Sequence, residues 1–328
     1  MAHLLVTGGA GYIGSHAMRA LQRAGHSAVV LDNLCAGNPD LVTGAPLIRA
    51  DVGDRERVRR VFQEHGPFDG VLHFAALLSV PESVARPLAY YENNVAQSLA
   101  LLDLAVEQGV RAFVLSSTAA VYGHPSKQPI PESEGAAPIN PYGHSKWMVE
   151  RILADAETAY GLRWAALRYF NACGADPEGG LGECHDPETH LIPICLEAAA
   201  DLREKLELYG TDYPTPDGTC VRDYIHVTDL ADAHVRALEA LLEGRSVGAR
   251  NVATGNGHSN LEVIATVEKV IGRRVPYREA PRRPGDPPVL IADASLFRRE
   301  FGWEPRYSDL DTVVRTAWSW LRHWKGVS

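Results

Sequence analysis

Residues 7–16 read TGGAGYIGSH, and three glycines of this stretch, Gly8, Gly11 and Gly14, recur at every third position. The apolar run at 3–6 predicts a buried strand before the stretch, and the apolar spacing at 17–21 predicts a helix after it. Glycines at a strand-to-helix junction allow a tight turn and let the backbone approach a pyrophosphate at the positive end of the helix. The stretch therefore predicts dinucleotide binding, although the spacing also fits a glycine-rich turn without a ligand.

The first half of the chain alternates the signals of strands and helices. Such alternation predicts an α/β fold, a doubly wound parallel sheet of the Rossmann type. Right-handed crossovers then bring the carboxyl ends of the strands to one edge, where ligands bind. The predicted strands are 3–6, 28–31, 47–50, 70–74 and 112–116, and two of the predicted helices are 55–65 and 94–108.

The second half lacks this alternation and predicts a smaller mixed α/β domain. Residues 173–186 are rich in glycine, proline and acids and predict a loop, whereas 209–223 predict turns and short strands. Helices are expected at 191–205 and 228–243. Composition marks no linker, so we place the domain boundary near residue 171 and expect the chain to cross back to the first domain around 221–245.

The composition argues against several classes of function. The net charge is −9, from 32 basic and 41 acidic residues, which disfavours nonspecific binding to nucleic acid. No apolar run approaches the ~20 residues that span a membrane. The cysteines number five and lack CxxC spacing; an odd count without a signal peptide suggests reduced intracellular thiols. Cys184, His185 and His190 do not follow the spacing of the common zinc motifs, so we expect no metal.

Acidic and small residues follow the predicted strands where a dinucleotide would lie. Asp32 ends the second strand and can accept hydrogen bonds from both ribose hydroxyls of an adenosine, which favours NAD because a carboxylate repels the 2′-phosphate of NADP. An aspartate in an ordinary turn is the alternative. Asp51 and Val52 follow the third strand and could meet the adenine. Small residues beside Phe74 and Ala75, after the fourth strand, would let the backbone approach the cofactor.

Thr118, Tyr142 and Lys146 form a candidate catalytic group. Thr118 follows a predicted strand, and Tyr142 begins a predicted helix that carries Lys146 four residues later on the same face. A tyrosine is a poor base at its usual pKa of about 10, but a nearby ammonium and a positive nicotinamide stabilise its phenolate. Tyr142 could then move a proton near neutral pH while Thr118 binds the same substrate hydroxyl. A surface pair of tyrosine and lysine is the alternative, which the glycine-rich stretch upstream disfavours.

Longer stretches carry a resemblance to a known family. The segments TGGAGYIGSH, HFAA, YYENNV, SSTAAVYG, PYGHSK and LRYFNACGAD resemble the extended short-chain dehydrogenase/reductases. More narrowly, the chain is similar to the UDP-glucose 4-epimerases, nearly from end to end. The stretches YGTDYPTPDGTCVRDYIHVTDLADAH and APRRPGDPP in the second half discriminate best between the members of the larger family.

The resemblance implies an NAD-binding domain at 1–171 and a nucleotide-sugar-binding domain at 172–328. It also implies the catalytic roles of Thr118, Tyr142 and Lys146. The residues that would bind NAD are Gly8, Gly11, Tyr12, Ile13, Gly14, Asp32, Asn33, Asp51, Val52, Phe74, Ala75, Asn94, Tyr142, Lys146 and Tyr169. The residues that would bind the UDP-sugar are Thr118, Asn171, His190, Leu191, Tyr209, Arg222, Arg283, Asp286 and Leu290.

The implied activity is the reversible epimerisation of UDP-galactose and UDP-glucose at the sugar 4-carbon, in galactose metabolism. Tyr142 would take the proton of the 4-hydroxyl while hydride passes to NAD, giving a 4-keto sugar and transient NADH. The keto sugar would turn over in the pocket before hydride returns to its other face. The resemblance thus implies an NAD-dependent isomerase, a cytoplasmic homodimer whose partners are UDP-sugars and neither nucleic acid nor a membrane.

Four positions depart from the pattern of the family. Thr118 stands where serine is frequent and keeps the hydroxyl. Leu78 and His190 replace a lysine and an asparagine of some relatives. Leu290 lies where relatives differ in side-chain bulk beside sugar carbon 2. A broader UDP-sugar 4-epimerase that also accepts N-acetylhexosamines therefore stays open.

Other functions on the same fold fit the residues less well. Nucleotide-sugar 4,6-dehydratases carry an acid pair after the catalytic hydroxyl, where this chain has Ala119 and Ala120. A decarboxylase or a uronate epimerase would need a carboxylate-binding site, which we do not identify. A noncatalytic NAD-sensing protein could share the fold, because fold does not determine function. The presence of Thr118, Tyr142 and Lys146 together argues against it.

Overall fold

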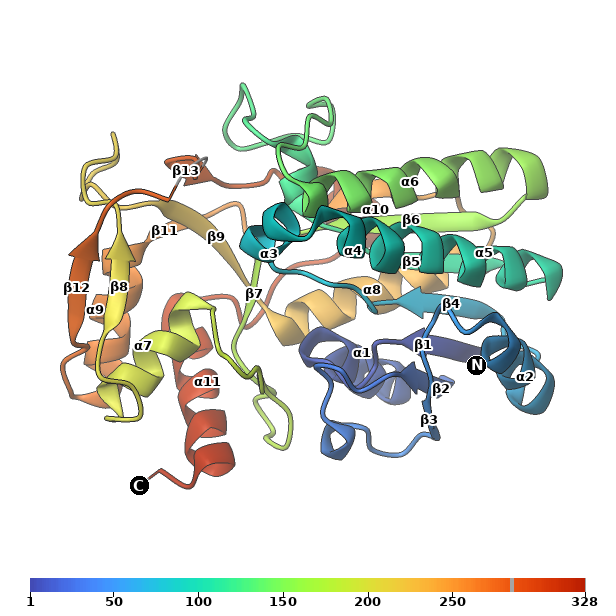
Figure 1. The fold of residues 1–328 in the computed structure, drawn as a ribbon, viewed down its shortest axis with the longest axis horizontal. Coiled ribbons are helices and arrows are strands. Elements are labelled where there is room, and N and C mark those ends of the chain that lie inside the picture. Colours follow the sequence, from blue (N-terminus) through green and yellow to red (C-terminus); the bar gives the residue numbers. More distant parts are fainter. Residues whose placement is uncertain (284–285, 328) are drawn as a thin grey trace.

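The computed structural model describes residues 1–283 and 286–327. Pro284 and Gly285, which belong to the APRRPGDPP stretch, lie outside the described residues. The chain forms a larger domain that holds the N-terminus and a smaller domain that holds the C-terminus (Figure 1). Among the described residues, no helix is at once long enough and apolar enough to span a membrane.

The larger domain is built on a sheet of seven parallel strands in the order β10-β6-β5-β4-β1-β2-β3. The central strand β1 pairs with two neighbours, and Leu5 lies opposite Val29 of one and Val71 of the other. This arrangement confirms the predicted doubly wound parallel sheet. Its strands are β1 (His3–Thr7), β2 (Ser27–Asp32), β3 (Leu47–Arg49), β4 (Gly70–His73), β5 (Ala112–Ser116), β6 (Arg163–Arg168) and β10 (Gly248–Asn251).

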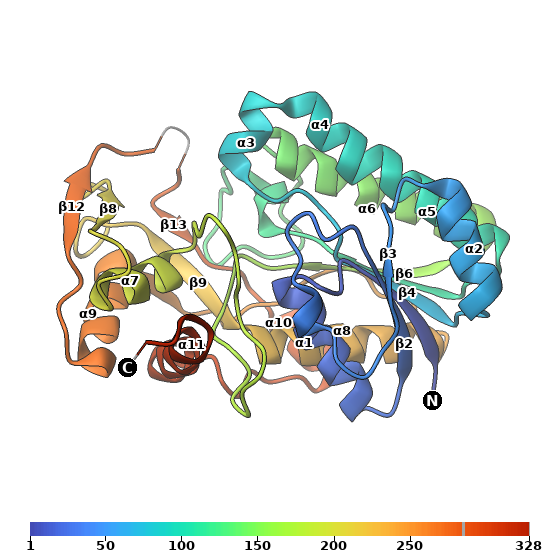
Figure 2. The same cartoon turned by 60° about the horizontal axis from the view of Figure 1, so that its bottom comes forward.

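Helices cover both faces of this sheet, which is why its central strands are almost wholly apolar. One face packs against α1 (Tyr12–Arg23), α8 (Val227–Leu242) and α10 (Ser295–Phe301). The other face packs against α2 (Arg55–His65), α5 (Gln97–Glu107) and α6 (Pro141–Tyr160). Figure 2 shows the two helical layers on opposite sides of the sheet.

The start of α6 is defined by its sequence. Asn140 accepts a hydrogen bond from the amide of Gly143 at 2.8 Å, and Pro141 occupies the first helical position, where no amide donor is needed. Gly161, in the left-handed conformation, ends the helix. Shorter helical segments of this domain are η1 (Pro39–Leu41), α3 (Val80–Ala85), α4 (Pro87–Tyr91), the π-helical turn η2 (Glu92–Ala96) and η3 (Ala119–Tyr122).

The smaller domain is a mixed α/β layer with its own apolar core. A four-stranded sheet contains β7 (Asn171–Cys173), β9 (Val221–His226), β11 (Gly257–Ser259) and β13 (Val289–Leu290). A two-stranded sheet pairs β8 (Leu206–Tyr209) with β12 (Tyr277–Ala280). The helices of this domain are α7 (Leu191–Ala199), α9 (Asn260–Ile271) and α11 (Leu310–Lys325).

Two regions differ in detail from the expected elements. The helix predicted at 191–205 ends at Ala199, because Asp201 takes the left-handed conformation with φ 60° and interrupts the helical backbone. The helix predicted at 94–108 begins earlier, as the π-helical turn η2, and continues into α5. The helix predicted at 55–65 is confirmed as α2.

Candidate active site

A cavity of about 410 Å³ lies at the carboxyl ends of the parallel strands. Residues that follow β1, β2, β4 and β5 form one part of its wall, as expected for an open α/β sheet. Residues of the smaller domain, among them Asn171, Arg222 and Leu290, form another part. The cavity therefore brings together the two halves of the predicted site.

The glycine-rich turn that opens the cavity has no room for a side chain at Gly8 or Gly14. Gly8 has φ +71°, and a Cβ there would lie 2.5 Å from the amide nitrogen of Ala75. A Cβ on Gly14 would lie 2.2 Å from the carbonyl oxygen of Gly8. Gly11 precedes α1 without a side-chain cap, so the first amides of α1 are not occupied by a capping side chain. This turn fits the pyrophosphate of NAD, because an anion is stabilised by such amides.

Asp32 is held in place by backbone amides at the end of β2. Its carboxylate accepts hydrogen bonds from Ala10 at 3.0 Å and from Leu34 at 2.8 Å. Asp32 and Asn33 both line the cavity. Asp51 does not, but it accepts a hydrogen bond from the Asn33 side chain at 3.1 Å. The carboxylate of Asp32 is thus fixed where the ribose of a dinucleotide fits.

Thr118, Tyr142 and Lys146 all line the same cavity. The Lys146 ammonium donates a hydrogen bond to the carbonyl of Ser116 at 2.9 Å, which ties the start of α6 to the end of β5. Burial raises the pKa of Tyr142 to about 12, against a hydrogen bond with Thr118 that lowers it. Burial also lowers the pKa of Lys146 to about 8, against the negative charge of Glu150. Desolvation thus disfavours both the Tyr142 phenolate and the Lys146 ammonium. A positively charged cofactor beside Tyr142 would stabilise the phenolate.

Glu150 anchors a buried polar network behind this group that the sequence interpretation did not include. Its carboxylate accepts hydrogen bonds from Ser117 at 2.5 Å and from the Arg168 Nε at 3.0 Å. Arg168 also donates to Tyr122 at 3.0 Å, and Tyr122 donates to Asn251 at 2.8 Å. The spacing of Glu150 four residues after Lys146 on α6 was the available signal, since such residues share a helix face.

Most residues predicted to bind a nucleotide sugar lie in the smaller domain, some on the cavity wall and some behind it. Arg222 lines the cavity and pairs with Asp286. Leu290 on β13 lies opposite Arg222 on β9, which places both at the same level of the cavity wall. The guanidinium of Arg283 lies 4.0 Å from the centre of the Tyr209 ring. Arg283, Tyr209 and Asp286 do not themselves line the cavity.

Most of the predicted site residues line the cavity, and several others support them. Asn94 stands behind the wall, where its side chain accepts a hydrogen bond from the Leu77 amide and donates one to the Leu77 carbonyl, both at 2.9 Å. The predicted residues that do not line the cavity are Asp51, Asn94, Leu191, Tyr209, Arg283 and Asp286. The lining residues that the sequence interpretation missed include Cys35, Ala36, Gly37, Leu77, Val80, Asn93, Gln97, Phe170, Glu183 and His185.

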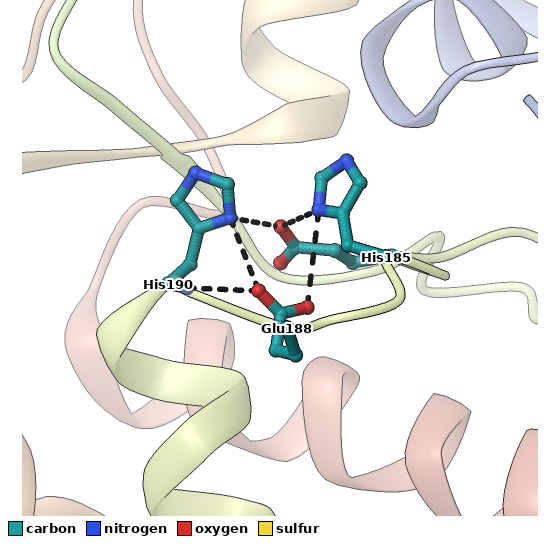
Figure 3. A group of neighbouring side chains, drawn as sticks. His185, Glu188 and His190 are labelled. Carbon is teal, nitrogen blue, oxygen red and sulfur yellow. Dashed lines mark hydrogen bonds and ion pairs between the residues drawn. The ribbon is translucent and has the colours of Figure 1, made fainter. Parts of the chain in front are cut away.

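A compact group of charged side chains forms another part of the wall. Glu183, His185 and His190 line the cavity, and Glu188 lies beside them (Figure 3). Burial lowers the pKa of His190, but Glu183 and Glu188 outweigh it and raise the pKa to about 10. Burial raises the pKa of Glu183, but His190 and His185 outweigh it and lower the pKa. In the absence of other ligands, the pair of Glu183 and His190 is therefore ionised.

The chain matches known proteins along nearly its whole length. The NAD dependent epimerase/dehydratase family matches residues 4–253. A UDP-glucose 4-epimerase of Azospirillum brasilense is 51% identical over 320 residues, 97% of this chain and 92% of the relative. One from Lacticaseibacillus casei is 47% identical over 318 residues, 97% of this chain and 96% of the relative.

Solved structures of similar proteins have the same fold. The crystal structure of UDP-glucose 4-epimerase from Brucella ovis in complex with NAD has a TM-score of 0.94 and 48% identity, covering 97% of this chain and 98% of that one. The enzyme from Stenotrophomonas maltophila, with bound NAD and formylated UDP-arabinopyranose, has a TM-score of 0.95 and 45% identity, covering 99% of both chains. The chain accordingly belongs to the NAD dependent epimerase/dehydratase family and, within it, to the UDP-glucose 4-epimerases.

Proposed function

We propose that this protein interconverts UDP-glucose and UDP-galactose by inverting sugar carbon 4, as an NAD-dependent isomerase of galactose metabolism. The observation that carries the proposal is one cavity lined by the glycine turn, by Asp32 and by the group of Thr118, Tyr142 and Lys146. The glycine turn and Asp32 fit a dinucleotide, and the three side chains of the catalytic group fit proton transfer at a sugar hydroxyl. The reaction has no net redox change, so a cofactor that stays bound suffices.

Tyr142 is the proton carrier of the proposed reaction. Bound NAD supplies the acceptor and then the donor of a hydride at sugar carbon 4. Tyr142 takes the proton of the 4-hydroxyl, and Thr118 binds the same oxygen and positions it. Lys146 lies one helical turn from Tyr142 and stabilises the phenolate by its charge. Once the 4-keto sugar has turned over, Tyr142 returns the proton to the oxygen on carbon 4, so that hydride adds to the opposite face of that carbon.

The smaller domain holds the nucleotide while the hexose rotates. Arg222 is the proposed ligand of the diphosphate, because a permanently charged planar guanidinium binds phosphate oxygens in pairs. Arg283 and Asp286 are proposed ligands at the phosphate and uridine end, with Tyr209, Asn171, His190 and Leu191 completing the substrate site. Of this set, Asn171, His190 and Arg222 line the cavity. Strong contacts to the nucleotide and weak contacts to the hexose are what a turnover of the sugar requires.

We further propose that the protein is a homodimer in the cytoplasm. Val84, Leu88 and Leu99 are 63%, 81% and 50% exposed, and they lie on α3, α4 and α5, which neighbour one another on one side of the larger domain (Figure 2). Exposed apolar side chains on adjacent helices support an interface with a second copy. The free cysteines support a reducing compartment. Light scattering on wild type and Leu88→Glu tests the interface, since a monomeric wild type would refute it.

The function is tested on the purified protein without added cofactor or reductant. Denaturation should release NAD, and the native protein should convert UDP-galactose to UDP-glucose until a fixed ratio is reached from either side. The matched control is the Tyr142→Phe variant, which keeps the cavity and loses the proton carrier. The proposal would be refuted if conversion requires a stoichiometric external reductant. It would also be refuted if the NAD-bound protein catalyses no conversion.

A further inference from the structure

Four potential metal ligands come from one short segment before α7. Glu183, His185, Glu188 and His190 each offer one ligand atom, and these atoms all lie within 4.8 Å of one another. The Nδ1 atoms of His190 and His185 lie 2.6 and 2.9 Å from the same Glu183 oxygen. The Nδ1 of His190 lies 3.2 Å from Glu188, and that of His185 lies 3.8 Å from it. Figure 3 shows the two imidazoles facing the carboxylates.

These short distances are not accompanied by well-directed hydrogen bonds. The Glu183 oxygen and the Nδ1 atoms of His185 and His190 are buried and have no partner with hydrogen-bond geometry. The side chain of Glu183 is only 6% exposed. These atoms are held together as ion pairs at the distances given above. Buried polar atoms that lack aligned hydrogen bonds are costly, and a cation bound by all four residues would satisfy them together.

The donor set matches the chemistry of one class of ion. Two imidazole nitrogens and two carboxylate oxygens are ligands of Zn²⁺ and similar divalent transition metals. Metal–ligand bonds of about 2.0 to 2.1 Å in a tetrahedron separate neighbouring ligand atoms by about 3.3 Å. The four nitrogen–oxygen separations run from 2.6 to 3.8 Å and all four ligand atoms lie within 4.8 Å of one another, so small side-chain shifts would bring them to a common cation. We propose that Glu183, His185, Glu188 and His190 bind a divalent transition-metal cation of the zinc class.

The surroundings of the four residues favour this assignment. One oxygen of Glu188 accepts hydrogen bonds from the amides of Thr189 and His190 at 2.7 and 2.8 Å. These bonds orient the carboxylate before a cation arrives, as supporting contacts do in known metal sites. Two carboxylates also balance the charge of a divalent cation. The expectation of no metal was drawn from cysteine and histidine spacing, which left Glu183 and Glu188 out of consideration.

The bound cation would fix the wall of the cavity, including His190 as a proposed contact of the UDP-sugar, and would take no part in proton transfer. No step of the proposed epimerisation uses a metal, so the inference goes beyond that function. Three of the four ligands line the cavity. The ring of His185 packs edge-on against that of Tyr12, beside the glycine turn, with 6.3 Å between the ring centres. A cation would fix these side chains relative to one another. Without a cation, the ion pair between His190 and Glu183 would hold the cluster together, and this state is the alternative to the metal site.

Direct binding measurements decide between a bound cation and an ion pair without metal. Chelator-treated full-length protein is titrated with Zn²⁺ by calorimetry and with Co²⁺ by its absorption spectrum, which reports four-coordinate geometry. We expect one ion per chain and the visible spectrum of a tetrahedral Co²⁺ centre. Glu183→Gln should weaken binding at least tenfold. The matched controls are Cys184→Ser, which removes a thiol, and His258→Gln, which removes a half-buried histidine outside the cluster; both should bind Zn²⁺ as the wild type does.

Two further measurements separate loss of metal binding from loss of the fold. Circular dichroism and retained NAD show whether Glu183→Gln has folded; if it has not, His185→Asn replaces it, because His185 is less buried. A wild type that binds Zn²⁺ no more tightly than the ligand variant would overturn the site. So would binding that Cys184→Ser abolishes, since the ligand would then be the thiol. Metal content is measured independently of epimerase activity, so failure of one proposal leaves the other intact.

Discussion

Glu150 lies one turn after Lys146 on the buried face of α6, and its negative charge opposes the loss of the lysine's proton. Lys146 itself is held by the Ser116 carbonyl, which carries no full charge. The protonation of the lysine beside Tyr142 therefore depends on a carboxylate that does not line the cavity.

The charge of Glu150 should determine the pH at which Lys146 loses its proton. Glu150→Gln should lower the pKa of Lys146 further below about 8, because the opposing charge is removed and Arg168 is left uncompensated. The alkaline limb of the pH–rate profile should then move to lower pH. Ser117→Ala, which removes one hydrogen bond to Glu150 but no charge, is the control. An alkaline limb at the same pH in wild type and Glu150→Gln would contradict the assignment.

Tyr142→Phe should leave the fold and the NAD content near those of the wild type and reduce turnover severely. The loss of a general acid–base group costs typically 10²–10⁴ in rate. Turnover is measured with UDP-galactose at saturation, and NAD is measured after denaturation. Retention of more than about a tenth of wild-type turnover would rule out Tyr142 as the sole proton carrier.

Asp32 should determine the choice of cofactor. Asp32→Ala removes the acceptor for the ribose hydroxyls together with the charge that repels a 2′-phosphate. NAD should therefore bind more weakly, and the ratio of NAD affinity to NADP affinity should fall. The variant also frees the amides of Ala10 and Leu34. Affinities of both cofactors are measured for both proteins. An unchanged ratio would refute the role.

Leu290 should limit the bulk of the sugar. Wild type should turn over the plain UDP-hexoses well and the N-acetyl sugars poorly but measurably. Leu290→Tyr should remove the N-acetyl activity and spare the hexoses, because overpacking a filled pocket costs about 1–3 kcal/mol, or roughly ten- to hundredfold. The ratio of kcat/KM between the two substrate pairs is compared in both proteins. Equal ratios would show that Leu290 does not control access.

Buried histidines should make the fold sensitive to acid. Burial lowers the pKa of His73 and His226 to about 3 and that of His16 and His234 to about 4. In the unfolded chain a histidine has a pKa near 6.5, so between that value and about 4 the unfolded state binds more protons. The free energy of unfolding should therefore be at its full value above pH 6.5 and fall as the pH drops toward 4.

Urea titrations at pH 7.5 and pH 5 measure this loss. A buried histidine contributes up to about 1.4 kcal/mol per pH unit within its window. His234→Phe should reduce the loss between the two pH values, whereas His124→Gln, at an exposed position, should not. An equal loss in both variants would mean that groups other than His234 dominate the acid sensitivity.

The sequence predicted those parts of the site whose residues are tied to regular elements. The glycine turn follows a strand, and Tyr142 and Lys146 share one face of a helix, so their proximity follows from local geometry. Glu183 and Glu188 belong to a loop, where acids carry no periodic signal and their approach to His185 and His190 depends on the folded path of the chain. The pairing of β8 with β12 joins segments about 70 residues apart, which no local pattern reveals.

The position of β10 and α8 in the chain bears on how the protein is made. Both belong to the larger domain, yet they follow β9 of the smaller one in the sequence, and α8 covers the sheet face that α1 only partly covers. A growing polypeptide that has emerged from the ribosome only as far as residue 170 would expose apolar residues of β5 and β6 to water. The nascent chain would therefore stay open to aggregation, or to capture by a chaperone, until residues 227–251 leave the exit tunnel.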